Sequence, residues 1–373
     1  MSASKGVMMA GRGRQGRATI ADVAAAAGVS TSTASLVYRR SERVLPDTRA
    51  RILAAAEQLG YQGPDPVASS LRSGRSGIIG IVIAERVRQA FQNPVAVATM
   101  DGLSDVLDGE GFGQLLLSGG AEPPEGRPNP LRMLPVDAVV FATRGEEFDH
   151  LLPLVRARGV PIVGIEGPHA EGVILVEVDD VGGMAAMAAH VAELGHRRVG
   201  VVMRTTRLGR DGAPGPVEPI GTRLEHISNR TIRGRLEAVQ SVFGDALRVE
   251  SGGRDVAAGA AAALKLLDRP DRPTAVLAQN DALAAGVLQA AATLGLEVPR
   301  DLTVTGFDGV DMAWLGRHLT TVRQPLHERG RRAGELVSAL LRGEDVPSST
   351  LLPVELIAGE TAGPPPVDRR ARP

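Results

Sequence analysis

A chain of 373 residues is too long for one ordinary domain, so we expect two or three folded units. Apolar residues make up 43% of it and charged residues 23%, which is typical of globular chains, and its apolar runs are too short to span a bilayer. The sequence contains no cysteine, which excludes disulfides, thiolate metal sites and cysteine nucleophiles.

Charge is distributed unevenly along the chain. Residues 1–75 contain 11 Lys and Arg against five Asp and Glu, although the net charge of the whole chain is −1, so the remainder carries −7. A cationic N-terminal segment on an acidic protein is typical of binding to a phosphate backbone, although a run of charge is also common on a solvated face. Residues 1–17, rich in Gly and Arg, are expected to be a disordered tail that adds nonspecific affinity.

Two short helical patterns follow the tail. Thr19 and Asp22 are spaced to cap a helix reciprocally, and apolar residues then recur on one face of that helix. Gly28 allows a tight turn, and Ser30 is placed to cap a second helix that runs to about Tyr38.

A third helix is predicted from Pro46 to Leu59, and Gly60 stands where a left-handed residue often ends a helix. Its expected inner face consists of Ile52, Leu53, Ala56 and Leu59. Three such helices make a compact unit. Beyond it, Asp65 and Pro66 favour the start of a short helix that ends near Leu71, and residues 73–77 favour a flexible joint.

From Ile78 onward, buried apolar runs alternate with helical stretches, a pattern typical of parallel sheets built from βαβ units. The expected strands are 78–83, 138–141, 161–165, 199–203, 274–278 and 303–307. These units suffice for two sheets of five or six strands, which predicts a two-lobed α/β domain with a cleft. Residues 204–228, rich in Gly, Pro and Arg, are expected to form a long loop.

Residues 19–37 read TIADVAAAAGVSTSTASLV, which resembles the helix-turn-helix of the lactose-repressor (LacI/GalR) family of transcriptional regulators. The similarity continues in order through residues 48–61, 67–72, 93–94, 195–196, 280–281, 304–308 and 319–325. Each piece alone is weak, but their order and spacing together identify the chain as a member of the family.

The resemblance implies that the helix from residue 30 to residue 38 lies in the major groove of DNA. Thr31, Ser32 and Leu36 stand at the family's reading positions, and leucine offers only apolar contact where members often have Arg or His. Nearby hydroxyls and basic side chains are expected to anchor phosphates, with helix capping as the alternative for the hydroxyls. These further contacts are Thr19, Ser30, Thr33, Ser35, Arg39, Arg40 and Arg43.

Leu71 matches the hinge-helix leucine that, in this family, wedges into the minor groove and kinks the operator. The alternative is that Leu71 packs on the domain below, but a short polar helix with one large apolar residue lacks a core-facing stripe. Ala68 and Arg72 complete the contacts implied for the hinge.

In the family, the two-lobed domain resembles periplasmic binding proteins and holds a small effector between its lobes. The implied effector-binding residues are Glu166, Arg235, Asn280, Asp308 and Gln324. Carboxylates, an arginine and amides near strand ends suit the hydroxyls of a sugar or the edge of a nucleobase. Arg230 and Arg233 compete with Arg235, while turn formation is the alternative for Asp308 and helix capping for Asn280.

Sugar-binding members commonly stack an aromatic ring on the ligand, but this chain has Val95 and Ala96 where aromatics are frequent. Aromatic residues make up only 2% of the sequence, which argues against a pyranose stacked in the usual manner. The few alternatives are Phe91, Phe141, Phe307 and Trp314.

The implied function is that of a sequence-specific transcriptional regulator, expected to be a repressor, whose operator affinity depends on a sugar or related metabolite. Its expected partners are a pseudo-palindromic operator, the effector and a second copy of the chain, in a homodimer or higher oligomer. A solute-binding protein is the alternative, but the basic N-terminal segment without an apolar export signal argues against it and favours a cytoplasmic location.

No cofactor, metal site, membrane association or enzymatic activity is expected, because neither metal-ligand spacing nor a catalytic motif is present. His196, near a predicted helix end, is expected to cap carbonyls there. The predicted domains are a tail (1–17), a helix-turn-helix (18–61), a hinge helix and linker (62–76), a two-lobed effector-binding and dimerisation domain (77–362) and a disordered tail (363–373).

Overall fold

The computed structural model describes residues 18–38, 43–63, 74–83, 87–119, 127–143, 150–205, 227, 229–244 and 246–366. Close contacts divide the chain into two units, Met1–Ser76 and Gly77–Pro373. The predicted N-terminal tail and most of the predicted loop at 204–228 lie outside the described residues. So do the predicted contact residues Arg39, Arg40, Ala68, Leu71 and Arg72.

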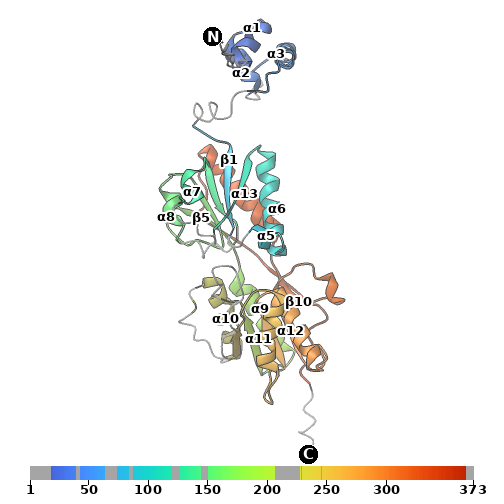
Figure 1. Ribbon diagram of the computed structural model, residues 1–373. Coiled ribbons are helices and arrows are strands. Elements are labelled where there is room, and N and C mark those ends of the chain that lie inside the picture. Colours follow the sequence, from blue (N-terminus) through green and yellow to red (C-terminus); the bar gives the residue numbers. More distant parts are fainter. Residues whose placement is uncertain are drawn as a thin grey trace, which may run out of the picture. The chain divides into compact units, whose positions relative to one another are not determined.

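The first unit contains the three predicted helices, α1 (Ile20–Ala26), α2 (Thr31–Tyr38) and α3 (Pro46–Gln58), as Figure 1 shows. Val23, Ala34 and Ile52, one from each helix, are fully buried and form the centre of its core. Apolar burial of this kind supplies most of the stability of short helices.

The inner face of α3 differs from the prediction at two positions. Leu53 is 47% exposed and Leu59 is 41% exposed, whereas Ala55 and Ala56 are buried beside Ile52. At 100° per residue, positions three and four after Ile52 share its face, whereas Leu53 points away from it. Leu59 is already the C-cap of α3, so it no longer follows the helical stripe.

The first sheet of the second unit has six strands in the order β11-β5-β4-β3-β1-β2, and all its pairings are parallel. Its strands are β1 (Ile78–Ile83), β2 (Gly113–Ser118), β3 (Ala138–Phe141), β4 (Ile162–Ile165), β5 (Val173–Val178) and β11 (Ser349–Leu352). The helices that accompany it are α5 (Val87–Ala90), α6 (Pro94–Gly109), α7 (Pro130–Met133), α8 (Leu152–Arg156) and α13 (Leu326–Arg342). Separate apolar clusters lie on its two faces, as expected for a parallel sheet.

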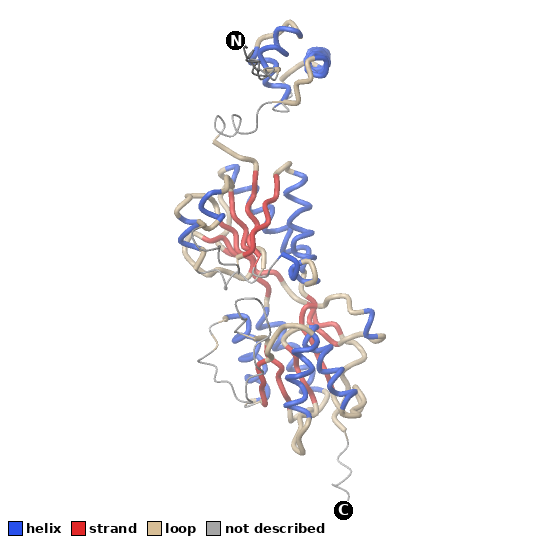
Figure 2. The backbone as a smooth tube through the Cα atoms, in the orientation of Figure 1, coloured by secondary structure: helices blue, strands red, loops and turns tan. Residues whose placement is uncertain are grey.

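The second sheet has the order β12-β10-β9-β8-β6-β7 and is parallel except for the antiparallel pair β10 and β12. Its strands are β6 (Val199–Met203), β7 (Leu247–Glu250), β8 (Ala275–Ala278), β9 (Thr303–Asp308), β10 (Thr320–Arg323) and β12 (Glu355–Ile357). Its helices are α9 (Asp180–Glu193), α10 (Arg230–Phe243), α11 (Val256–Leu267), α12 (Asp281–Thr293) and the short 3₁₀ helix η3 (Ala313–Leu315). Figure 2 shows the strands of each sheet flanked by helices, so the predicted two-lobed α/β fold is confirmed.

Helices α6 and α13 approach each other at backbone distance. A Cβ on Gly330 of α13 would lie 1.9 Å from the Thr99 carbonyl oxygen, and a Cβ on Gly102 of α6 would lie 1.9 Å from the carbonyl oxygen of His327. Glycine is therefore required at both positions, and both helices share an apolar cluster with strands of the first sheet.

Gly363, the first residue of the predicted C-terminal tail, is bonded to β9. Its N–H donates to Thr303 Oγ1 (3.0 Å), and its carbonyl accepts from that hydroxyl (2.9 Å). The predicted role of His196 was also wrong: its ring is fully buried, with Nδ1 2.9 Å from Thr274 Oγ1 and Nε2 2.8 Å from the Gly363 carbonyl oxygen. Burial lowers the pKa of His196, so the neutral ring ties the C-terminal segment to the second sheet.

Among the described helices, none has both the length and the apolar content to cross a membrane by itself; α1 and α2 reach that threshold only as a pair, with a 110° bend between them.

Candidate functional site

Helix α2 presents exposed hydroxyl groups at its N-terminal end. Thr31 and Ser32 are exposed, whereas Thr33 and Ser35 are half-buried. Ser30 Oγ accepts a hydrogen bond from the Thr33 N–H (3.1 Å) and lies 2.8 Å from Ser32 Oγ. Ser30 therefore caps α2, the alternative considered for it, while Thr31 and Ser32 remain accessible.

Thr19 also acts as a cap. Its Oγ1 accepts from the Asp22 N–H (3.4 Å), and the Thr19 N–H donates to Asp22 Oδ2 (2.8 Å). Two hydrogen bonds to its carboxylate lower the pKa of Asp22: the larger effect comes from the Thr19 N–H and the smaller one from the Thr19 hydroxyl. Arg43 is exposed at the surface of the unit.

Leu36, which was predicted to contact DNA bases, is less exposed than Thr31 and Ser32. It is half-buried and packs against the apolar core that includes Val23 and Ile52. Part of its surface therefore stabilises the three-helix unit and only the rest can meet another molecule.

The second candidate site lies where strands of both sheets end. Asp308 is the last residue of β9, and its Oδ1 accepts a hydrogen bond from Gln324 Nε2 (2.7 Å), just after β10. Gln324 Oε1 in turn accepts from Arg329 Nη1 (3.0 Å) in the first turn of α13. Ligands of open α/β sheets bind at such carboxyl ends.

Glu166 follows β4 and joins the same network. Its backbone has φ of 58°, in the left-handed region that non-glycine residues seldom adopt. Its Oε1 accepts from Arg329 Nη1 (2.9 Å), and Arg329 Nε donates to Thr99 Oγ1 on α6 (2.9 Å). Burial opposes ionisation of Glu166, but the charges of Arg329, Arg204 and Arg235 outweigh it and lower its pKa.

Arg235 is fully buried, and its charge acts on both Glu166 and Asp308. Its Nε donates to Asp180 Oδ1 (2.8 Å), and its guanidinium lies 3.5 Å from the centroid of the Phe307 ring. Arg233 instead donates to the Ile227 carbonyl oxygen (2.9 Å), and Arg230 is exposed. Of the three candidate arginines, Arg235 is thus the one brought to the polar site.

Asn280 caps α12, the alternative considered for it. Its Oδ1 accepts from the Leu283 N–H (2.7 Å), and its Nδ2 faces the Arg254 carbonyl oxygen at 3.4 Å. Both ends of its amide therefore already have contacts within the protein.

Asp308 has a strongly perturbed carboxyl. Burial, and next the charge of Asp281, raise the pKa of Asp308 to about 7, although Arg235, Arg204 and Arg329 oppose this. Its backbone also has φ of 133°. Strained backbone and a perturbed carboxyl at a strand end are typical of functional sites.

Four charged residues of this site were not predicted from the sequence: Asp180, Arg204, Asp281 and Arg329. Arg204 comes directly after β6, and Asp180 comes two residues after β5, so the tendency of ligands to bind at strand ends, which also supports Asp308, could have indicated both of them. Arg329 carries no such signal, because it lies inside an amphipathic helix.

Two of the four aromatic alternatives, Phe141 and Phe307, are unavailable to a ligand. Phe141 is fully buried in the core, and Arg235 covers one face of the buried Phe307. Phe91, next to α5, is 63% exposed. The site is therefore dominated by hydrogen-bonding and charged groups, which suits a polar ligand.

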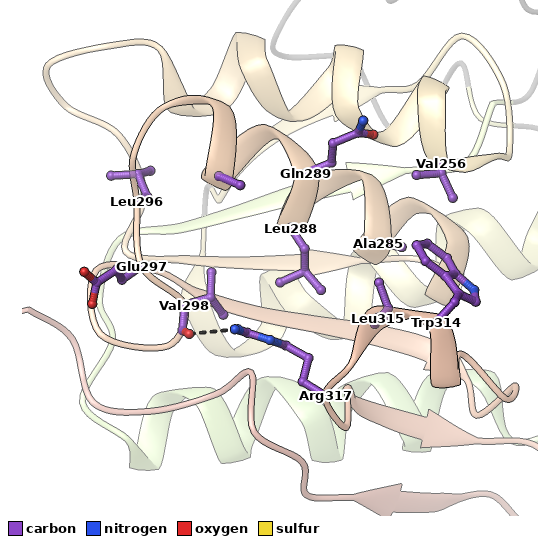
Figure 3. Close-up of a pocket in the computed structure, with 11 residues that line it drawn as sticks. Val256, Ala285, Leu288, Gln289, Leu296, Glu297, Val298, Trp314, Leu315 and Arg317 are labelled. Carbon is purple, nitrogen blue, oxygen red and sulfur yellow. Dashed lines mark hydrogen bonds between the residues drawn. The ribbon is translucent and has the colours of Figure 1, made fainter.

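A separate groove of about 720 Å³ lies on α12, between α11 and η3 (Figure 3). Trp314 and Val256 line one end of it and Leu296 and Glu297 the other, as Figure 3 shows. Trp314 is 64% exposed, and Arg317 is fixed by donating to the Val298 carbonyl oxygen (2.9 Å). The lining is largely apolar and contains none of the charged residues of the polar site.

Comparison with known proteins gives matches to both units. The family model for bacterial regulatory proteins of the lacI family matches residues 19–63, and that for the periplasmic binding protein-like domain matches residues 188–362. The chain is similar to an HTH-type transcriptional regulator of Mycolicibacterium smegmatis, with 37% identity over 361 residues that cover 94% of this chain and 97% of the relative.

Solved structures match along the same length. A LacI-family transcriptional regulator from Corynebacterium glutamicum has a TM-score of 0.65 and 29% identity, covering 94% of this chain and all of the other. The complex of the transcriptional regulator CelR with cellobiose has a TM-score of 0.61 and 25% identity, covering 93% of this chain and all of the other.

Proposed function

The chain belongs to the LacI family of DNA-binding transcriptional regulators. We propose that it is a repressor that binds a pseudo-palindromic operator, and that a small ligand changes its affinity for this operator. One observation carries the proposal: a single chain joins a three-helix unit with exposed hydroxyls on α2 to a polar site at the strand ends of a two-sheet domain.

The DNA-binding part of the proposal assigns α2 to the major groove. Thr31 and Ser32 are accessible for base edges, and the exposed Arg43 suits a phosphate. The excess of positive charge in residues 1–75 supports the same assignment. We retain the predicted hinge (62–76), with Leu71 as its minor-groove wedge and Ala68 and Arg72 beside it.

The ligand part assigns the effector to the polar site. Glu166, Arg235, Asp308 and Gln324 lie in one network of hydrogen bonds and charges, which supports their proposed role. Asn280 is proposed with them through its position after β8, although its amide caps α12. A sugar or related metabolite fits this donor and acceptor set, and the similar CelR was solved with cellobiose.

The oligomer part assigns the groove beside Trp314 to a second copy of the chain. A largely apolar groove with one exposed tryptophan at its end is the composition expected at the centre of a protein interface. A symmetric dimer presents two copies of α2, as a pseudo-palindromic operator requires.

The experiment that tests the function is selection of operator sequences from random duplexes with the full-length protein. We expect enrichment of a pseudo-palindromic sequence that binds at least about 1,000-fold more tightly than a scrambled duplex at the same salt concentration. Leu71→Ala should weaken binding to the selected sequence at least about tenfold and leave scrambled DNA nearly unaffected, because a wedge acts only at a kinked site. Equal losses on both duplexes would exclude the wedge, and absence of any enriched sequence would exclude the function.

A further inference from the structure

Arg204 lies among the charged groups of the polar site without forming a salt bridge to any described residue. It follows β6 directly, and its backbone N–H donates to Gln279 Oε1 (3.2 Å). Its guanidinium lies within range of the charges of Glu166, Asp180 and Asp308. Nevertheless, its Nε is buried and has no hydrogen-bond partner within the part of the chain that the structure describes. A buried donor without a partner is rare in native proteins and indicates a missing acceptor.

The neighbouring carboxylates already have partners. Glu166 is paired with Arg329, at 2.9 Å, and Asp180 is paired with Arg235. Asp281 accepts hydrogen bonds from the Thr321 hydroxyl and from the Val310 N–H (2.9 Å). These three acids therefore form their salt bridges and hydrogen bonds with groups other than Arg204, and Arg204 Nε has no acceptor among the described residues.

Asp308 does not remove this positive charge. Its carboxyl is bonded to the neutral amide of Gln324 rather than to an arginine. Because burial and the charge of Asp281 raise the pKa of Asp308 to about 7, the carboxyl is neutral in a large part of the molecules at neutral pH. In that state it is a hydrogen-bond donor, and it no longer repels a negatively charged group beside Arg204.

We infer that the effector of this site carries an oxyanion, a carboxylate or a phosphate, on a hydroxylated skeleton, and that Arg204 binds the oxyanion. The inference rests on the proposed function for the location of the effector. A guanidinium matches the geometry of an oxyanion with two parallel N–H donors, and partial burial strengthens such charge-assisted hydrogen bonds. The hydroxyl groups of the skeleton would be bound by carboxylates and amides such as Glu166 and Gln324.

The inference is tested by titration calorimetry of the full-length protein with inorganic phosphate, acetate, glucose, gluconate and glucose 6-phosphate. We expect saturable binding of at least one oxyanion probe, and tighter binding of gluconate or glucose 6-phosphate than of glucose. Gluconate and glucose 6-phosphate distinguish a carboxylate ligand from a phosphate ligand. Arg204→Gln should weaken oxyanion binding at least about tenfold, because both the charge and the paired donors are lost.

Two further variants complete the test. Arg204→Lys keeps the charge without the paired donors and should bind with intermediate affinity, which also covers the case in which Arg204→Gln does not fold. Arg332→Gln, in which an accessible arginine bonded to Glu335 on α13 is replaced, should bind as the wild type does. The inference is overturned if the wild type binds none of the oxyanions saturably, if glucose binds as tightly as its anionic counterparts, or if the Arg204 variants retain wild-type affinity. Because operator selection is measured separately, these results leave the proposed DNA binding untouched.

Discussion

Asp308 makes the stability of the protein depend on pH near neutrality. With the pKa of Asp308 raised from 3.8 to about 7 by burial and by Asp281, the folded chain holds this proton more tightly than the unfolded chain does. The resulting stabilisation is complete below about pH 4 and is lost as the pH rises through about 7. Asp308→Asn, which stays neutral and can still accept from Gln324, should therefore gain stability relative to the wild type by about 3 kcal/mol between pH 5 and pH 8.

Urea unfolding of both proteins at pH 5, 6, 7 and 8 measures this gain. Asp271→Asn is a suitable control, because Asp271 is exposed and its hydrogen bond from Arg269 lowers its pKa, which places its titration below this range. Curves of stability against pH that run parallel for Asp308→Asn and the wild type would show that Asp308 is already ionised at pH 5.

The network around Asp308 also shows which site residues a sequence can predict. The family resemblance predicts Glu166, Arg235, Asp308 and Gln324, and for Asp308 the end of an apolar run supports the same prediction. Arg329 follows a helical pattern in which a charged residue normally faces solvent. Only the close packing of α13 on α6 buries it beside Thr99, and no local pattern encodes that contact.

Among the elements, the pair α6 and α13 has the least tolerance for added volume. Gly330→Ala would place a methyl group 1.9 Å from the Thr99 carbonyl oxygen, so the helices would have to separate. We expect a loss of about 3 kcal/mol in the free energy of unfolding, at the upper end of the range for overpacking. Gly109→Ala, at the end of α6 with no atom within 4 Å of the added Cβ, should instead stabilise the protein by about 0.5 kcal/mol through helix propensity. Urea unfolding at one pH compares the two, and equal effects would contradict the close approach.

Sequence patterns predicted the central elements better than the peripheral ones. Strands β1, β3, β4, β6, β8 and β9 are continuous buried runs and were predicted nearly to the residue. Strand β2 is exposed or half-buried throughout, and β11 alternates between exposed and half-buried residues. A strand at the edge of a sheet has little apolar signal, and its pairing partner is distant in the sequence, so its presence follows from the assembled sheet.

At the scale of the whole molecule, the proposed dimer should control operator affinity. Trp314→Asp places a charge in the apolar groove on α12, where a second copy would have to desolvate it, and should shift the protein from dimer to monomer in sedimentation velocity. A monomer presents one α2 helix to one half-site, so it loses the effective concentration that linkage gives the second half-site. We therefore expect operator binding at least about 100-fold weaker, with binding to scrambled DNA affected far less.

Met133→Asp is the matched control, because Met133 is a 70% exposed apolar residue on α7 outside the groove, and it should leave both measurements unchanged. If Trp314→Asp stays dimeric, the groove on α12 is not the dimer interface. If Trp314→Asp is monomeric but binds the operator with wild-type affinity, operator binding does not depend on dimerisation.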